Sequence, residues 1–183
     1  AADLRALPLE AILDANPGLG FWPITDGHVI PQHPPQVFAE SQQSDVPLLA
    51  GWNKDEGFNF DVTTWGELKG KPFTEIVSVL FPANAAAVLE HYSSSRDLGG
   101  DLVINHSAWA WIEAHRKTAT SDIFRYRFDR APKTPKGWFP EGANAGAFHS
   151  CEILYMFNNL DAFPWLVDEH DQHVADTMSA YWI

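Results

Sequence analysis

The sequence has a single cysteine, Cys151, among its 183 residues. No disulfide can form within this segment, which excludes a small fold held together by disulfides. One cysteine assigns no redox compartment, and the sequence leaves the cellular location open. A catalytic thiol would need an oriented base beside it, and the sequence offers no residue that would orient a pair of Cys151 and His149. We therefore expect Cys151 to be a small buried side chain.

Basic residues are also scarce, with 12 Lys and Arg against 24 Asp and Glu, a net charge of −12. Nucleic acids and anionic membrane surfaces require a basic face on their partner, so we expect neither as a partner. The apolar runs are far shorter than the roughly 18–20 residues of a membrane span. Hydrophobic residues make up 45% and charged residues 20% of the chain, a balance typical of a folded globular domain.

What the sequence does contain is a histidine in a distinctive setting. Residues 146–157 read Gly-Ala-Phe-His-Ser-Cys-Glu-Ile-Leu-Tyr-Met-Phe. Gly146 and Ala147 permit a tight backbone bend, so His149 can project from a loop tip rather than lie within a helix or strand. Such a position suits a residue with a chemical task.

A second polar cluster lies upstream, with Glu56 93 residues before His149. The apolar run 46–50 suits a parallel strand covered on both faces. We expect Gly51 to let the chain leave the sheet at its carboxyl end, where open α/β sheets place their sites. Asp55 and Glu56 therefore lie where chemistry is expected, and chemistry alone does not separate the two carboxylates.

These motifs resemble those of the type-B carboxylesterases, the cholinesterase-like branch of the α/β-hydrolases. The histidine segment matches the family pattern Gly-Ala-x-His-x-x-Glu, and residues 51–57 match its acid turn, Gly-x-Asn-x-Asp-Glu-Gly. A third family motif, Pro-x-x-Asp-Gly, is present at residues 23–27. The resemblance extends from about Leu4 to Trp182. It implies an α/β fold, the C-terminal half of an α/β-hydrolase, with residues 1–183 forming part of a single catalytic domain.

The resemblance also implies a Ser-Glu-His triad with Glu56 as the acid and His149 as the general base. α/β-Hydrolases keep the chain order Ser, acid, His, so the nucleophile should precede Glu56. No Gly-x-Ser-x-Gly motif is present, since none of the ten serines has a glycine two positions before it. The only Gly-Gly pair, residues 99–100, lacks the context of an oxyanion hole.

We therefore interpret the chain as a carboxylesterase segment cut at both ends and catalytically silent alone. Its expected partners are the missing N-terminal half of the domain and a small carboxylic ester. The reaction that the resemblance implies uses no metal and no organic cofactor.

Two alternatives remain open. The first is a cholinesterase-like adhesion module without a working triad, although both motifs are intact here. The residue at the missing serine position would discriminate it from an esterase. The second is a metal site formed by His28 and His33, or by His170 and His173 with the acidic residues 168, 169 and 171. These spacings fit no structural zinc pattern.

Periodicity and turn signals place the remaining elements. We expect a turn at residues 26–27 that positions a short hairpin. A second strand is expected over 123–128, as a parallel neighbour of the first. Helices are expected at 3–16 (stopped at 16–18), 73–80, 84–92 and 99–120, with a last helix opening at 161–164.

Overall fold

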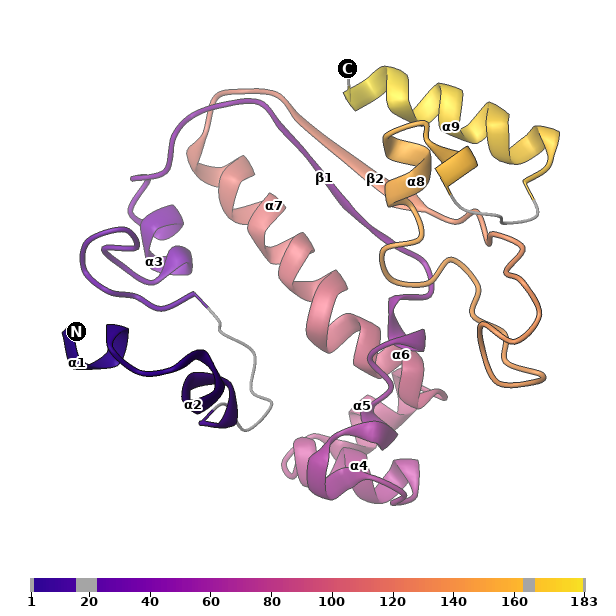
Figure 1. Cartoon of the computed structure of the whole chain (residues 1–183), viewed down its shortest axis with the longest axis horizontal. Coiled ribbons are helices and arrows are strands. Elements are labelled where there is room, and N and C mark those ends of the chain that lie inside the picture. Colours follow the sequence, from indigo (N-terminus) through magenta and orange to yellow (C-terminus); the bar gives the residue numbers. More distant parts are fainter. Residues whose placement is uncertain (1, 16–22, 163–166, 183) are drawn as a thin grey trace.

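The computed structural model describes residues 2–15, 23–162 and 167–182. Two strands, β1 (Leu48–Asn53) and β2 (Ile123–Phe128), pair in parallel with Leu48 opposite Ile123 and Asn53 opposite Phe128. They lie side by side, with α7 on one side and α8 and α9 on the other (Figure 1). The predicted parallel pairing is confirmed, and β2 has the predicted bounds.

The described helices are short apart from α7 and α9. They are α1 (Ala2–Arg5), α2 (Leu9–Asp14), α3 (Pro34–Ala39), α4 (Phe73–Leu80), α5 (Ala85–His91), α6 (Ser95–Gly100), α7 (His106–Thr118), α8 (Ile153–Met156) and α9 (Glu169–Trp182). A π-helix, η4 (Asp101–Asn105), joins α6 to α7, and 3-10 turns occur at η1 (Glu56–Phe58), η2 (Val62–Thr64), η3 (Gly66–Leu68) and η5 (Leu160–Ala162). No helix in the described ranges is long and apolar enough to cross a bilayer.

The first strand begins and ends later than predicted. It runs through Gly51 to Asn53 rather than leaving the sheet at Gly51. A Cβ atom at Gly51 would lie 2.1 Å from the carbonyl oxygen of Tyr126 on β2. Glycine is therefore needed there because the neighbouring strand approaches closely, and not because the chain turns.

The predicted helix over 3–16 is wrong, because the chain forms α1 and α2 with a break between them. Pro8 precedes α2 in an extended conformation, with φ −60° and ψ 149°. Proline has no N–H and also disfavours a helical conformation in the residue before it, which stops α1 from continuing. The predicted stop at 16–18 lies outside the described residues.

The predicted hairpin at residues 26–27 is also wrong, since both described strands lie elsewhere. One carboxylate oxygen of Asp26 accepts the backbone N–H groups of His28, Val29 and Ile30 at 2.9–3.0 Å. Three consecutive amides bound to one side chain are lost to strand pairing. The segment is a turn held by its own aspartate.

The helices at 73–80 and 84–92 are confirmed by α4 and α5. The expected helix over 99–120 begins earlier, at Ser95, because the Ser94 hydroxyl accepts the N–H groups of Arg96 and Asp97. The last helix begins later than predicted. Part of 161–164 lies outside the described residues, and α9 starts at Glu169, where the Asp168 carboxylate accepts two backbone N–H groups of the first turn.

Two apolar clusters hold the elements together. The first is built between β2, α8 and α9 and includes Phe128, Phe148, Leu154, Tyr155 and Met178. The second joins η2, α4 and α6 through Val62, Ile76, Val77 and Leu98. The first cluster matters for the site because it packs directly beneath the loop that carries His149.

Candidate active site

Glu56 lies three residues beyond the end of β1, at the start of η1. Its side chain is only 4% exposed. One carboxylate oxygen, Oε1, accepts the backbone N–H of Asn53 at 2.8 Å. The other, Oε2, lies 2.6 Å from Nδ1 of His149. The parallel strands thus bring an acid and a histidine 93 residues apart into direct contact.

His149 lies in the turn that precedes α8, as the sequence predicts for a loop residue. Its side chain is 39% exposed and packs edge-on against Phe60, with the ring centroids 4.9 Å apart. With Glu56 accepting at Nδ1, the neutral ring carries its proton there, and Nε2 holds a lone pair. The ring can therefore act as a base at Nε2.

Asp55, the other candidate acid, has a different role. Its carboxylate accepts the backbone N–H of Ala147 at 2.8 Å, and its own N–H donates to the Ala147 carbonyl at 3.0 Å. These two bonds clasp the histidine loop two residues before His149. The structure therefore separates the two carboxylates that chemistry alone left equivalent.

Gly146 makes this clasp possible. Its φ of +59° is in the left-handed region, and a Cβ atom there would lie 2.2 Å from the Asp55 carboxylate oxygen. A side chain would meet both backbone strain and the clasping carboxylate. The expectation of a glycine bend before His149 is confirmed.

Asn53 is a residue of the site whose contacts sequence reasoning missed. Its side-chain amide nitrogen donates to the carbonyl of Phe148 at 2.9 Å and to the carboxylate of Glu152. The family motif contains both Asn53 and Glu152, but a motif does not show that they touch. Only the folded chain brings them together.

Cys151 is buried, as expected, with 1% of its surface exposed. Burial raises the pKa of its thiol well above the usual range, and the nearby carboxylates of Glu152 and Glu56 raise it further. A nucleophilic cysteine needs the opposite environment, one that stabilises the thiolate. Cys151 is a packing residue of the first apolar cluster.

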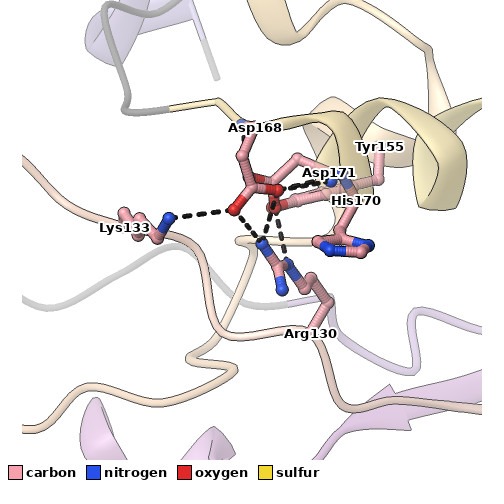
Figure 2. Close-up of polar contacts among 6 residues, drawn as sticks. All are labelled: Arg130, Lys133, Tyr155, Asp168, His170 and Asp171. Atoms are coloured by element: carbon pink, nitrogen blue, oxygen red, sulfur yellow. Dashed lines mark hydrogen bonds and ion pairs between the residues drawn. The ribbon is translucent and has the colours of Figure 1, made fainter.

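The acidic residues near α9 do not form a metal site with His170 and His173. Figure 2 shows the carboxylates of Asp168 and Asp171 turned toward the Arg130 guanidinium, with Lys133 on the far side of Asp168. His28 and His33 are exposed on the segment before β1. Among the residues that the structure describes, no three His, Cys, Asp or Glu side chains are grouped to hold a metal.

No family model matches the chain. It is 29% identical over 181 residues to the para-nitrobenzyl esterase of Bacillus subtilis (strain 168), which covers 90% of this chain and 34% of that protein. It is 22% identical over 218 residues to the inactive carboxylesterase-like protein VdtD of Byssochlamys spectabilis, which covers 98% of this chain and 37% of that protein.

The fold matches that of a solved carboxylesterase, EST55 of Geobacillus stearothermophilus, with a TM-score of 0.71 and 23% identity. The match covers 99% of this chain and 38% of the esterase. The two parallel strands and their helices are thus part of an α/β-hydrolase fold, and the chain spans little more than a third of these relatives. These sequence and fold matches show that the chain is homologous to the type-B carboxylesterases over that part of their length.

Proposed function

We propose that this chain supplies the acid and the general base of a carboxylic ester hydrolase, Glu56 and His149. The nucleophilic serine and the oxyanion hole would come from sequence upstream, in the same domain. The observation that carries the proposal is the 2.6 Å contact between His149 Nδ1 and the buried Glu56 carboxylate, which leaves Nε2 as the basic atom.

In the proposed reaction, Nε2 of His149 takes the proton of the serine hydroxyl as the oxygen attacks the ester carbonyl. The resulting imidazolium returns the proton to the leaving alcohol, which yields an acyl-enzyme. Water activated in the same way then releases the carboxylic acid. Glu56 keeps the ring in the Nδ1–H tautomer and stabilises the imidazolium, because its carboxylate is buried beside it. No metal or organic cofactor takes part.

The upstream part of the domain would also have a surface to cover. A groove of about 840 Å³ lies along β2 and α9, and its lining is mostly apolar, with Phe124 58% exposed and Tyr181 76% exposed. Exposed aromatic side chains gathered along one groove are consistent with a contact between this surface and another part of the protein. Because the nucleophile would also come from this upstream part, we infer that the 183-residue chain alone does not hydrolyse esters.

A second candidate is a carboxylesterase-like protein without activity. The match to VdtD, a protein named as inactive, over 98% of this chain favours it. In that case Glu56 and His149 would be retained only as part of the fold. The residue in the nucleophile position of the full-length protein separates the two candidates.

The test is an assay of the full-length protein, meaning this chain with its upstream part, on an activated aryl ester of a short carboxylic acid. The His149→Ala variant should lose at least about 1,000-fold in kcat, because the serine then has no base. The matched control is His91→Ala, which removes an exposed histidine at the end of α5. Full activity in His149→Ala, or none in the wild type, would contradict the esterase proposal.

A further inference from the structure

We propose that Asn53 is a positioning residue that sets the geometry between Glu56 and His149. The inference rests on the proposed function. Asn53 is the last residue of β1 and is 1% exposed, so its side chain is fixed by the sheet and by packing. It contacts Glu56 through its backbone N–H, and it contacts residues on either side of His149 through its side chain.

On the acid side, the Asn53 backbone N–H donates to Oε1 of Glu56 at 2.8 Å. This bond occupies the oxygen that does not face the histidine and directs Oε2 toward the ring. A carboxylate held at one oxygen cannot rotate freely about its terminal bond. The end of β1 therefore orients the acid.

On the histidine side, the Asn53 amide donates to the Phe148 carbonyl at 2.9 Å and to the Glu152 carboxylate, and it lies 4.0 Å from the Cys151 sulfur. Residues 148 and 152 lie on either side of His149, so one side chain spans the base of the turn. That turn contains Ser150 at φ +70°, a conformation that non-glycine residues rarely adopt and that the surrounding contacts must hold.

The residue type follows from this arrangement. Two N–H donors on one short side chain are what an asparagine provides, whereas an aspartate would direct a negative oxygen at another carboxylate and a carbonyl. The Asn53 carbonyl oxygen, Oδ1, is buried and has no hydrogen-bond partner within the described part of the chain, so the amide is placed for donation. The separate Asp55 clasp on Ala147 still ties the loop to the turn when Asn53 changes. A variant should therefore keep the fold and lose the alignment.

The first measurement follows the tautomer of His149, which does not depend on catalysis. In the full-length protein at a pH where the ring is neutral, ¹⁵N shifts of the imidazole should show the Nδ1–H form in the wild type. In Asn53→Ala they should move toward the Nε2–H form, which an unconstrained histidine prefers. The control is Asn59→Ala. Asn59 is exposed and directly follows η1, the turn that begins at Glu56.

The second measurement is turnover of the activated aryl ester. Asn53→Ala and Asn53→Asp should lower kcat by about 100-fold with little change in KM, because a misplaced base costs on the order of that factor. Asn59→Ala and Asn59→Asp should match the wild type. If Asn53→Ala fails to fold, Asn53→Ser is decisive, because its hydroxyl keeps a polar group in the space but ends one bond short of both acceptors.

The outcomes separate the two proposals. A retained Nδ1–H tautomer in the folded Asn53 variants, or an unchanged kcat in a protein that does hydrolyse esters, would overturn the positioning role. A wild type without turnover, combined with a tautomer shift in Asn53→Ala, would refute the esterase proposal and leave the positioning role supported.

Discussion

Two of the charged junctions that join distant parts of this chain use their polar atoms differently. At the first, Glu56 binds Asn53 through one oxygen and His149 through the other, and the histidine is 39% exposed. At the second, which we call the Arg130 cluster (Arg130, Lys133, Tyr155, Asp168 and Asp171), Asp171 Oδ1 accepts from both Arg130 and Tyr155, and Oδ2 accepts the N–H of Asp168 (Figure 2).

The difference lies in what each junction leaves unused. In the Arg130 cluster, both oxygens of the Asp171 carboxylate, which is 2% exposed, are committed to hydrogen bonds. The Glu56–His149 pair ends in a ring nitrogen that carries a lone pair and lies on a half-exposed side chain. Saturated junctions stabilise a fold, whereas a junction with one uncommitted basic atom can perform chemistry.

The largest effect on stability should come from Arg130→Met. The change leaves Asp171 ionised, buried and without its cation, and such broken pairs cost about 3–5 kcal/mol of unfolding free energy. Urea unfolding of the full-length protein measures this. The matched control is Lys133→Met, because Lys133 is 58% exposed and binds the partly exposed Asp168. It should cost no more than about 1 kcal/mol.

Ester turnover per folded molecule should remain near the wild-type level in Arg130→Met, because the cluster contacts neither Glu56 nor His149. A loss of kcat as large as that of His149→Ala, at temperatures where the variant is folded, would show that the two junctions are not independent. An unfolding free energy equal to that of Lys133→Met would show that the cluster contributes little to stability.

A smaller effect on stability, combined with an effect on activity, is expected for Gly146→Ala. The residue has φ +59°, and the new Cβ would lie 2.2 Å from the Asp55 carboxylate, so the Asp55 clasp must open. Backbone strain of this kind costs about 1–3 kcal/mol. The temperature of thermal unfolding and kcat should both fall, because the loop that carries His149 shifts.

The matched control for that change is Gly142→Ala. Gly142 also has a positive φ, +78°, but nothing lies within 4 Å of a Cβ built there. It should show the strain without the loss of activity. Equal kcat values for the two variants would mean that the Asp55 clasp does not position His149.

The sequence predicts the contact between Glu56 and His149 better than it predicts the Arg130 cluster. The contact between Glu56 and His149 follows from motifs that keep residue types and order across a family. The bond between Arg130 and Asp171 joins residues 41 apart, one on a loop and one on a helix, and no local pattern marks it. The alternative of a metal site places Asp168 and Asp171 together, as they are in the structure. It pairs them with a metal ion rather than with Arg130, because residue spacing alone does not show which cation lies opposite them.

The fold shows the same division. The alternating pattern predicts the bounds of the second strand to the residue. In the structure Phe128 is buried, whereas Phe124, on the same predicted face, is 58% exposed along the groove. The predicted first strand lies two to three residues too early, because Gly51 after an apolar run resembles a turn signal. A glycine is required at position 51 because the Tyr126 carbonyl of the neighbouring strand approaches closely. This contact joins residues 75 apart in sequence, so local sequence propensity cannot predict it.

The smallest effect should be the response of the Arg130 cluster to acid. Burial opposes ionisation of Asp171, yet the Arg130 guanidinium, the Asp168 N–H and the Tyr155 hydroxyl together hold its pKa below the usual value. The unfolded state therefore binds more protons than the folded state between the two pKa values, and stability rises with pH in that window.

The contribution of Asp171 is complete above about pH 5, because an unfolded aspartate titrates near 3.9. It is lost as the pH falls through the folded pKa. A protonated Asp171 still offers Arg130 one carboxyl oxygen, and Asp168 still accepts from Arg130, so the loss should be smaller than in Arg130→Met. Urea unfolding at pH 7, 5, 4 and 3 should show the wild type losing its advantage over Asp171→Asn at the two lowest values. A constant difference across the series would mean that Asp171 has the same pKa in the folded and unfolded states, so that Arg130 does not stabilise its ionised form. A difference that shrinks as the pH rises would mean that Asp171 is neutral in the folded protein, and the cluster would then be a neutral hydrogen-bond network.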